Sequence, residues 1–438
     1  MLYMLKTDVY FVRGALNGAL LDTRRGNVYS INEKACQVLM GEREDSEYWK
    51  LLSDQGLSDS PGSIKRAKFS RRTPCELDFV WFEITSSKCN QSCIHCYTDS
   101  SPQTSREKQK HVDTLLTHQQ WLQAIREAYN LGCKKCQFIG GEPFLYRGKG
   151  GETLRNLVSY SRDLGYNFIE VFTNGLLLTP ARIAWLKELG VHVAISLYSM
   201  EASIHDCITQ TPGSQRQTMS AIEEMLARDI PFRVETVLMK PNEKSVPRLQ
   251  EAKKTWGVES TVDILRPTGR GDKQRFQPEF EYLAKHGLQL EPAFVIDEQT
   301  LRRNLGGNPC LQKQLVLTAS GEVFPCVFAR ETHLGSIKKT SLAGIIEETR
   351  TQEIWNATKD GVLVCKDCEY RYVCQDCRPL AKAEAHPRGN LMSAPPPRCT
   401  YNPYTGEWAA GLWTLGNEAS PFYDRTKGEE IQRLLQIK

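Results

Sequence analysis

The chain has 438 residues, 40% of them hydrophobic and 25% charged, which is the composition of an ordinary globular protein with two or three domains. The 56 basic residues barely exceed the 52 acidic ones, so the net charge of +4 gives no reason to expect a nucleic-acid partner. No apolar run reaches the roughly 18 residues that a membrane span needs. The N-terminus, MLYMLKTD, does not resemble a secretory signal. We therefore expect a cytoplasmic protein with no nucleic-acid and no membrane partner.

The N-terminal part of the chain predicts a small unit of strands followed by helices. Three short strands are predicted first, over residues 7–13, 17–23 and 28–31. Asn32 is placed to cap a helix through EKACQVLM, and a second helix is predicted over 46–55. A polar, basic stretch at 58–74 has the composition of a linker. We take residues 1–73 as a first domain.

From residue 79 onward, predicted strands and helices alternate. The strands are expected at 79–85, 136–140, 168–173, 191–196, 232–238 and 261–265. Helical stretches separate them, at about 118–131, 151–164, 181–189, 216–228 and 245–256. This order predicts an α/β fold with a parallel sheet curved into a partial (βα)6 barrel over residues 74–300. Ligands of such sheets bind at the carboxyl ends of the strands.

The 15 cysteines are unevenly distributed, and in a reducing compartment such clusters bind metal or carry out redox chemistry. Cys89, Cys93 and Cys96 form a C-x3-C-x2-C motif directly after the first barrel strand. Three thiolates on a tight loop can hold three irons of a [4Fe–4S] cube and leave the fourth iron open to a small molecule. The alternative is a zinc site with His95 as fourth ligand, although the flanking sequence is not typical of a zinc finger.

The motif and its position resemble the signature of the radical S-adenosylmethionine (SAM) superfamily. Gly140-Gly141-Glu142-Pro143 follows the second strand, as the GGEP motif of that family does, and glycines there let backbone approach a ligand. The stretch 195–222 is similar to the family's strand-four region with its HD…GS…R pattern. By this resemblance, the residues that bind SAM are Gly140, Gly141, Glu142, Pro143, Thr173, Asn174, Ser196 and Arg216.

Within that set, the resemblance assigns Ser196 and Arg216 to the ribose and carboxylate of SAM. The alternative for Arg216 is an ordinary exposed position on a helix. The resemblance implies an oxidoreductase-type enzyme that reductively cleaves SAM to a 5′-deoxyadenosyl radical, which takes a hydrogen atom from the substrate. It also implies a low-potential electron donor, such as ferredoxin or flavodoxin.

A second cysteine set resembles the seven-cysteine SPASM extension, which carries one or two auxiliary [4Fe–4S] clusters, and we assign it to a domain over 301–438. By position, auxiliary cluster I would be held by Cys310, Cys326 and Cys377. Auxiliary cluster II would be held by Cys365, Cys368, Cys374 and Cys399. Two departures from the pattern are the two residues, rather than three, between Cys374 and Cys377, and the missing fourth cysteine of cluster I. The alternative is a zinc ribbon.

The N-terminal unit resembles the small peptide chaperone of pyrroloquinoline quinone biosynthesis, whose relatives bind a leader peptide at a sheet edge. The alternative is a plain structural cap on the barrel. The combination implies a monomeric maturase of ribosomally synthesised (RiPP) precursor peptides that abstracts hydrogen and forms an oxidative crosslink. Two other hypotheses are a SPASM dehydrogenase of a protein side chain or small alcohol, and a zinc-stabilised binding module.

Overall fold

The computed structural model describes residues 4–59, 76–85, 88–102, 115–258, 262–286, 294–385, 389–416, 420–429 and 433. The chain forms two compact units. Unit 1 comprises Met1–Pro74, Leu283–Gln312 and Glu353–Lys438, and unit 2 comprises Cys75–Tyr282 and Lys313–Gln352. The predicted linker lies outside the described residues except for Ser58 and Asp59, as does Cys75. The predicted division into three domains stays a prediction.

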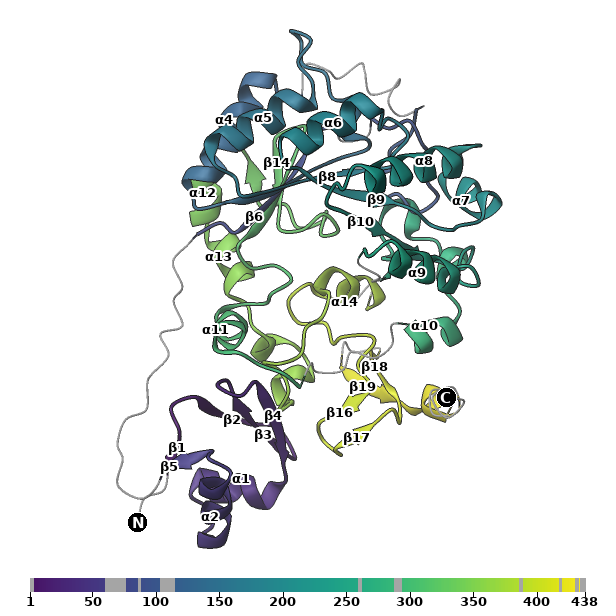
Figure 1. The fold of residues 1–438 in the computed structure, drawn as a ribbon. Helices are drawn as coiled ribbons and strands as arrows, with labels where there is room; N and C mark the ends of the chain where they lie inside the picture. The colour runs from purple at the N-terminus through teal and green to yellow at the C-terminus, as the bar shows by residue number, and fades with distance from the viewer. Residues whose placement is uncertain are drawn as a thin grey trace. The chain divides into compact units, whose positions relative to one another are not determined.

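Unit 1 begins with the predicted strands and helices. Strands β2 (Val9–Arg13), β3 (Gly18–Asp22) and β4 (Asn27–Ile31) form an antiparallel sheet in that order, and β1 (Met4–Leu5) pairs with β5 (Ser58–Asp59). Helices α1 (Glu33–Met40) and α2 (Ser46–Asp54) follow the sheet (Figure 1). The side chain of Asn32 accepts a hydrogen bond from Ala35 N, which confirms the predicted cap.

The sheet β2–β4 is buried on both faces, since neighbouring residues of a strand point to opposite sides. On one face, Leu20 packs in a cluster with Val9 of β2, with Leu52 of α2 and with Leu57, which follows α2. On the other face, Leu21 packs in a cluster with residues from the C-terminal half of unit 1, among them Leu301, Tyr370, Tyr372, Val373 and Tyr401. The N-terminal sheet is therefore a layer of unit 1 with a core on each side.

The rest of unit 1 consists of short elements around the second cysteine set. The helices are α11 (Glu298–Gly306), α14 (Arg378–Glu384) and the one-turn helices η5 (Lys359–Gly361), η6 (Cys365–Asp367) and η7 (Arg425–Lys427). Two hairpins follow, formed by β16 (Tyr401–Asn402) with β17 (Glu407–Trp408) and by β18 (Leu412–Leu415) with β19 (Pro421–Asp424). Two helices, α10 (Phe280–His286) and α13 (Thr349–Asn356), lie where the chain passes between the units.

Unit 2 is built on an eight-stranded sheet in the order β10-β9-β8-β7-β6-β13-β14-β15. Its parallel strands are β6 (Phe79–Glu83), β7 (Lys135–Ile139), β8 (Phe168–Thr173), β9 (His192–Ser196) and β10 (Phe232–Glu235). The next two strands, β11 (Val237–Leu238) and β12 (Asp263–Ile264), form a separate parallel pair. The predicted α/β fold with a parallel, barrel-like sheet is confirmed.

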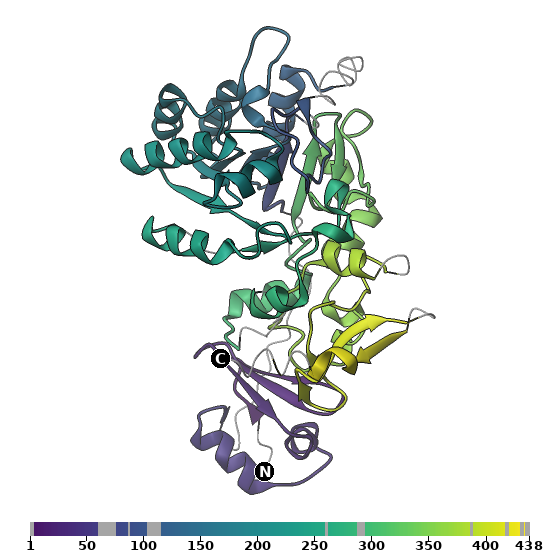
Figure 2. The same cartoon turned by 90° about the vertical axis from the view of Figure 1, so that its right-hand side faces the viewer.

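Helices connect the parallel strands of unit 2 and lie along one side of the sheet (Figures 1 and 2). They are α4 (His118–Asn130), α5 (Leu154–Leu164), α6 (Pro180–Glu188), α7 (Ala202–Thr209), α8 (Ser214–Ala227) and α9 (Val246–Thr255), with the one-turn helices η2 (Pro143–Leu145), η3 (Gly269–Gly271) and η4 (Gln274–Phe276). Thr117 and Gln120 form a capping box at the start of α4. In the part of the chain that the structure describes, no helix is long and apolar enough to cross a membrane.

A strand from the second cysteine region extends this sheet. Strand β13 (Gln314–Thr318) pairs in parallel with β6, and β14 (Glu322–Phe324) and β15 (Gly335–Ser336) continue antiparallel from it. Helix α12 (Leu342–Glu347) then packs against α4. Residues 313–352 thus belong by their contacts to the same unit as the barrel strands.

Candidate active site

The C-x3-C-x2-C loop follows β6 and lies at the carboxyl ends of the parallel strands. Cys89, Cys93 and Cys96 line one cavity of about 340 Å³. Two of the sulfurs accept backbone hydrogen bonds, Cys89 Sγ from Gln91 N (3.4 Å) and Cys96 Sγ from Ser100 N (3.3 Å). Such bonds stabilise thiolates, which are the form of cysteine that binds iron.

Arg270 holds the cysteine loop in place through its whole guanidinium group. Its Nε donates to the carbonyl of Cys93 (2.8 Å), and its two terminal nitrogens bond Asp99 Oδ1 and the carbonyl of Ser100, each at 2.6 Å. The backbone N–H of Arg270 also donates to the carbonyl of Cys96 (3.0 Å). No sequence motif indicates this role of Arg270, because the contact joins residues 177 positions apart in the chain.

The GGEP glycines bring two backbone segments together. A Cβ on Gly141 would collide with the carbonyl of Lys88, the residue before Cys89, and a Cβ on Gly140 would collide with Thr85. The N–H of Glu142 donates to the same Lys88 carbonyl at 2.9 Å. The glycines therefore let the end of β7 pack closely against the cysteine loop, and both also line the cavity.

Glu142 is fully buried and its carboxylate points inward to the ends of two strands. It accepts hydrogen bonds from Thr173 Oγ1 (2.9 and 3.0 Å), Asn174 N (3.0 Å) and Phe144 N (3.1 Å). Burial raises the pKa of Glu142 to about 7, although these hydrogen bonds oppose the shift. The structure thus gives this side chain a positioning role, bracing the GGEP turn against β8. Pro143 is buried and begins η2.

Of the other predicted SAM residues, most lie at the cavity and one does not. Thr173, Asn174 and Ser196 line it, at the ends of β8 and β9. Arg216 is exposed on α8 and is not among the lining residues. Asp206, from the HD…GS…R stretch, accepts hydrogen bonds from the backbone of Gly213 and Gln215 and so caps the start of α8.

Two ion pairs that no local motif indicates lie at the cavity; Glu170 of the first is buried, and Asp263 of the second is exposed. Arg233 bonds both carboxylate oxygens of Glu170, at 2.8 and 2.9 Å. Arg266 pairs with Asp263 in the same two-pronged way, at 2.9 and 3.3 Å. Arg233, Asp263 and Arg266 line the cavity directly. Planar pairs of this kind present fixed polar groups to a bound molecule. Strand alternation could have placed Arg233 of β10 on this face, but Arg266 lies beyond the end of β12.

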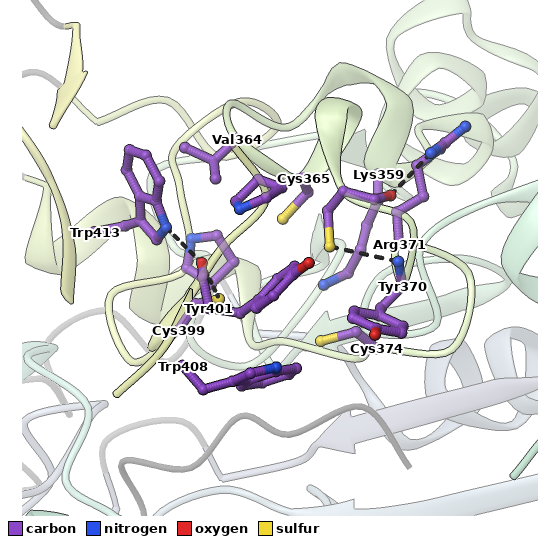
Figure 3. A pocket seen from close by; sticks show the side chains of 13 residues that line it. Lys359, Val364, Cys365, Tyr370, Arg371, Cys374, Cys399, Tyr401, Trp408 and Trp413 are labelled. Carbon is purple, nitrogen blue, oxygen red and sulfur yellow. Dashed lines mark hydrogen bonds between the residues drawn. The ribbon is translucent and has the colours of Figure 1, made fainter. Parts of the chain in front are cut away.

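The four cysteines predicted for auxiliary cluster II line a single pocket in unit 1. Figure 3 shows Cys365, Cys374 and Cys399 around it, and Cys368 is a fourth lining residue. The pocket is closed by aromatic side chains, including Tyr370, Tyr401, Trp408 and Trp413. Trp413 Nε1 donates to the carbonyl of Tyr401 (2.8 Å), so the C-terminal hairpins pack against this pocket. Trp408 and Trp413 thus line the cysteine pocket of unit 1.

The three cysteines predicted for auxiliary cluster I are divided between the units. Cys310 and Cys377 belong to unit 1, and Cys326 to unit 2. Their assignment to one cluster stays a prediction.

The cysteine thiols of the two sites are suitable ligands for iron–sulfur clusters. Three thiols share the cavity of unit 2 and four share the pocket of unit 1, and thiolates are the ligands of [4Fe–4S] cubes. Among the described residues, no group of three or more His, Cys, Asp or Glu side chains is spaced to hold a single metal ion. Each thiolate of a cube binds a different iron, so its sulfurs lie farther apart than those of a mononuclear site.

Comparison with known families agrees with both sites. Residues 84–251 match the radical SAM superfamily, and residues 309–378 match SPASM, an iron–sulfur cluster-binding domain. The chain is a radical SAM enzyme with a SPASM domain. Its cofactors are SAM, the [4Fe–4S] cluster of the radical SAM domain and one or two auxiliary [4Fe–4S] clusters in the SPASM domain.

Three known proteins illustrate the range of similar radical SAM enzymes. The AdoMet-dependent heme synthase of Methanosarcina barkeri is 28% identical over 369 residues, covering 74% of this chain and 96% of that protein. The antilisterial bacteriocin subtilosin biosynthesis protein AlbA of Bacillus subtilis is 25% identical over 291 residues, covering 63% and 61%. The crystal structure of Streptococcus suis SuiB bound to the precursor peptide SuiA shares the fold, with a TM-score of 0.52, 12% identity and coverage of 85% and 95%.

Proposed function

We propose that this radical SAM enzyme is a peptide maturase that binds a ribosomally made precursor and modifies its core region. The observation that carries the proposal is the N-terminal sheet, which offers strand edges in a chain that also holds the radical SAM cavity. AlbA, by its name, acts in the biosynthesis of a bacteriocin, and SuiB binds a precursor peptide. In this proposal residues 1–73 recognise the leader, residues 74–300 form the radical SAM barrel and residues 301–438 form the SPASM domain.

The leader is proposed to add a strand along the outer edge of β4. In the described part of the chain, β4 is an outermost strand of its sheet, and its outer side forms one bridge, from Asn27 to Val295. Tyr29 and Ile31 are half-buried against the cluster of the two N-terminal helices. An extended peptide on this edge gains main-chain hydrogen bonds from β4 and an apolar surface for its alternate side chains.

In the barrel cavity, the residues of the chain bind, orient and shield. When bound, SAM and its cluster supply one-electron cleavage and hydrogen abstraction. Cys89, Cys93 and Cys96 are proposed to hold the cluster, while the turn at Gly140 and Gly141 forms the neighbouring wall. Arg233 and Arg266 are oriented by their carboxylate partners and offer fixed donors to polar groups of the core peptide.

The modification that we propose is an oxidative crosslink. The core peptide would lose one hydrogen atom to the 5′-deoxyadenosyl radical, then one electron to an auxiliary cluster and one proton to solvent, so its mass would fall by two hydrogens. Each cycle starts with one electron from an external low-potential protein of the ferredoxin or flavodoxin type. We expect the enzyme to act as a monomer.

A second candidate is an enzyme with a small, non-peptide substrate. The alignment with the heme synthase of M. barkeri covers 96% of that protein, so most of its length has a counterpart in this chain. In that case the N-terminal sheet would serve only as a structural layer of unit 1.

Hydrogen–deuterium exchange separates the two candidates. Reconstituted enzyme is compared with and without synthetic leaders of peptides encoded next to its gene. The maturase proposal expects slower exchange of the amides of residues 27–31 with the right leader, because their outward N–H groups gain partners. The hairpin β18–β19 serves as a control and should not change. Unchanged exchange in β4 with every neighbouring peptide, together with no peptide of altered mass, would contradict the proposal. Deleting the unit is a poorer test, because it would uncover the core around Leu21.

A further inference from the structure

The cysteine pocket of unit 1 contains a buried positive charge that the ligand set does not explain. Lys359 is the first residue of η5, and it is only 4% exposed. It lines the same pocket as the four cysteines, and Figure 3 shows its side chain reaching into the space between them. Lysine is among the residues most rarely buried, since removing an ammonium from water is costly.

Lys359 belongs to a buried triad of charges. Its Nζ lies 3.0 Å from Asp376 Oδ1, and Arg378 bonds the other oxygen of Asp376 at 2.6 Å. The side chains of Asp376 and Arg378 are each 1% exposed. Two cations and one anion leave one positive charge in excess beside the cysteines.

The two cations of the triad differ in how their hydrogens are used. Arg378 also donates to the carbonyls of Leu391 (3.0 Å) and Ala394, so its guanidinium is held by three acceptors, as a structural arginine is. Lys359 Nζ lies 3.0 Å from Asp376 Oδ1, which can take up one of its three N–H groups, and among the described residues the others have no hydrogen-bond acceptor. A buried ammonium with unused N–H groups requires an acceptor in the pocket that it faces.

A [4Fe–4S] cube with four thiolate ligands provides such an acceptor. With four cysteines it carries a charge of about −2 when oxidised and −3 after taking up one electron, and hydrogen bonds to its sulfurs tune its potential. A cation in a pocket of low polarity stabilises the more negative form, because the Coulomb interaction is weakly screened there. Tyr370, Tyr401, Trp408 and Trp413 give the pocket that low polarity.

We propose that Lys359 is a positioning residue that donates a hydrogen bond to a sulfur of auxiliary cluster II and raises the reduction potential of that cluster. The cluster thereby becomes a better one-electron acceptor than it would be with the same four cysteine ligands and no lysine beside it. This inference rests on the proposed assignment of Cys365, Cys368, Cys374 and Cys399 as ligands of one cluster, and it does not depend on the substrate.

The test is an anaerobic redox titration of the reconstituted full chain with dithionite, followed by electron paramagnetic resonance. Dithionite supplies the one electron that each cluster takes up. The signal of cluster II is identified as the one that Cys399→Ala removes, and the signal that Cys89→Ala removes serves as an internal reference. Lys359→Met keeps the length of the side chain without its charge, and it should lower the midpoint potential of cluster II while the reference stays unchanged.

Two further variants distinguish electrostatics from general damage to the pocket. Asp376→Asn removes the negative charge of the triad and should shift the potential of cluster II upward, opposite to Lys359→Met. Lys366→Met is the matched control, because Lys366 is next to Cys365 but its side chain is 49% exposed and lies 3.0 Å from a carboxylate oxygen of Asp367. Solvent screens that charge, so this variant should leave the potential unchanged.

The possible failures have separate meanings. Full iron content with an unshifted potential in Lys359→Met, or a shift of the same sign in Lys359→Met and Asp376→Asn, would overturn the role of Lys359. If Lys359→Met holds no cluster II, Asp376→Asn decides, and an unchanged or lower potential refutes the inference. If no signal of the wild-type protein depends on Cys399, the ligand assignment itself is wrong and the inference falls with it.

Discussion

The hydroxyl of Thr173 lies 2.9 and 3.0 Å from the two carboxylate oxygens of Glu142, so a buried contact joins the ends of β7 and β8. Glu142 in turn follows the glycine that packs against the backbone of the cysteine loop. The cysteine loop and the strand ends that carry the proposed SAM-binding residues are therefore connected by direct contacts. A substitution at the end of β8 should thus also affect the end of β7.

These contacts predict a specific effect of substituting Thr173. Thr173→Val keeps the shape of the side chain but leaves the buried carboxylate without that donor, which should lower the free energy of unfolding by about 1–3 kcal/mol. SAM binding should weaken as well, because Asn174 and the GGEP turn lose their brace. Thr173→Ser retains the hydroxyl and is the control. Denaturant unfolding and equilibrium dialysis with SAM measure both effects, and equal values for the two variants would contradict this expectation.

The close packing at Gly141 predicts loss of one cluster without loss of the others. In Gly141→Ala the new methyl group collides with the carbonyl of Lys88, so the segment that carries Cys89 must shift. We expect about four fewer iron atoms per chain and no 5′-deoxyadenosine, with the auxiliary clusters retained. Gly361→Ala is the control, since a methyl group there would meet nothing within 4 Å. Normal iron and SAM cleavage in Gly141→Ala would show that the loop adapts.

The two faces of the N-terminal sheet predict different consequences for neighbouring leucines. Leu20 and Leu21 are both 0% exposed, so either change to alanine should cost about 2–5 kcal/mol of stability. Leu21 shares its cluster with Tyr370 and Tyr401, which line the cysteine pocket. Leu21→Ala should therefore also reduce the signal of auxiliary cluster II, while Leu20→Ala should not. Iron analysis and thermal unfolding of the pair test this, and identical cluster loss in both would contradict the two-core arrangement.

Buried His205 predicts a pH dependence of stability in unit 2. Its Nδ1 accepts a hydrogen bond from Tyr198 N (3.2 Å), and burial lowers its pKa to about 4 from 6.5. Between these two values the unfolded chain binds a proton that the folded chain does not, so stability falls as the pH falls from 6.5 toward 4, by at most about 3 kcal/mol. His205→Asn keeps an acceptor without the titration, so its unfolding free energy should fall less over pH 7 to 5. Parallel slopes for wild type and variant would refute this.

The parts of the structure that were predicted correctly are those that local sequence determines. The cap at Asn32 and the capping box of Thr117 and Gln120 depend on residues within one helical turn, and the strand order follows from alternating strands and helices. Arg270 and Lys359 could not be found in this way. The first meets its cysteine loop across 177 residues, and the second meets cysteines whose side chains converge only through irregular loops. Arg216 shows the opposite error: it matches a sequence motif for SAM binding, but the structure places it on the exposed side of a helix.

Mass spectrometry of the reaction products tests whether this radical SAM enzyme modifies a precursor peptide. Reconstituted enzyme is incubated anaerobically with SAM, dithionite and each peptide encoded beside its gene, and both 5′-deoxyadenosine and peptide mass are measured. We expect 5′-deoxyadenosine together with one peptide lighter by two hydrogens, and we expect Cys89→Ala to abolish both. Cleavage of SAM with every such peptide unchanged, or a peptide altered equally by Cys89→Ala, would contradict this expectation.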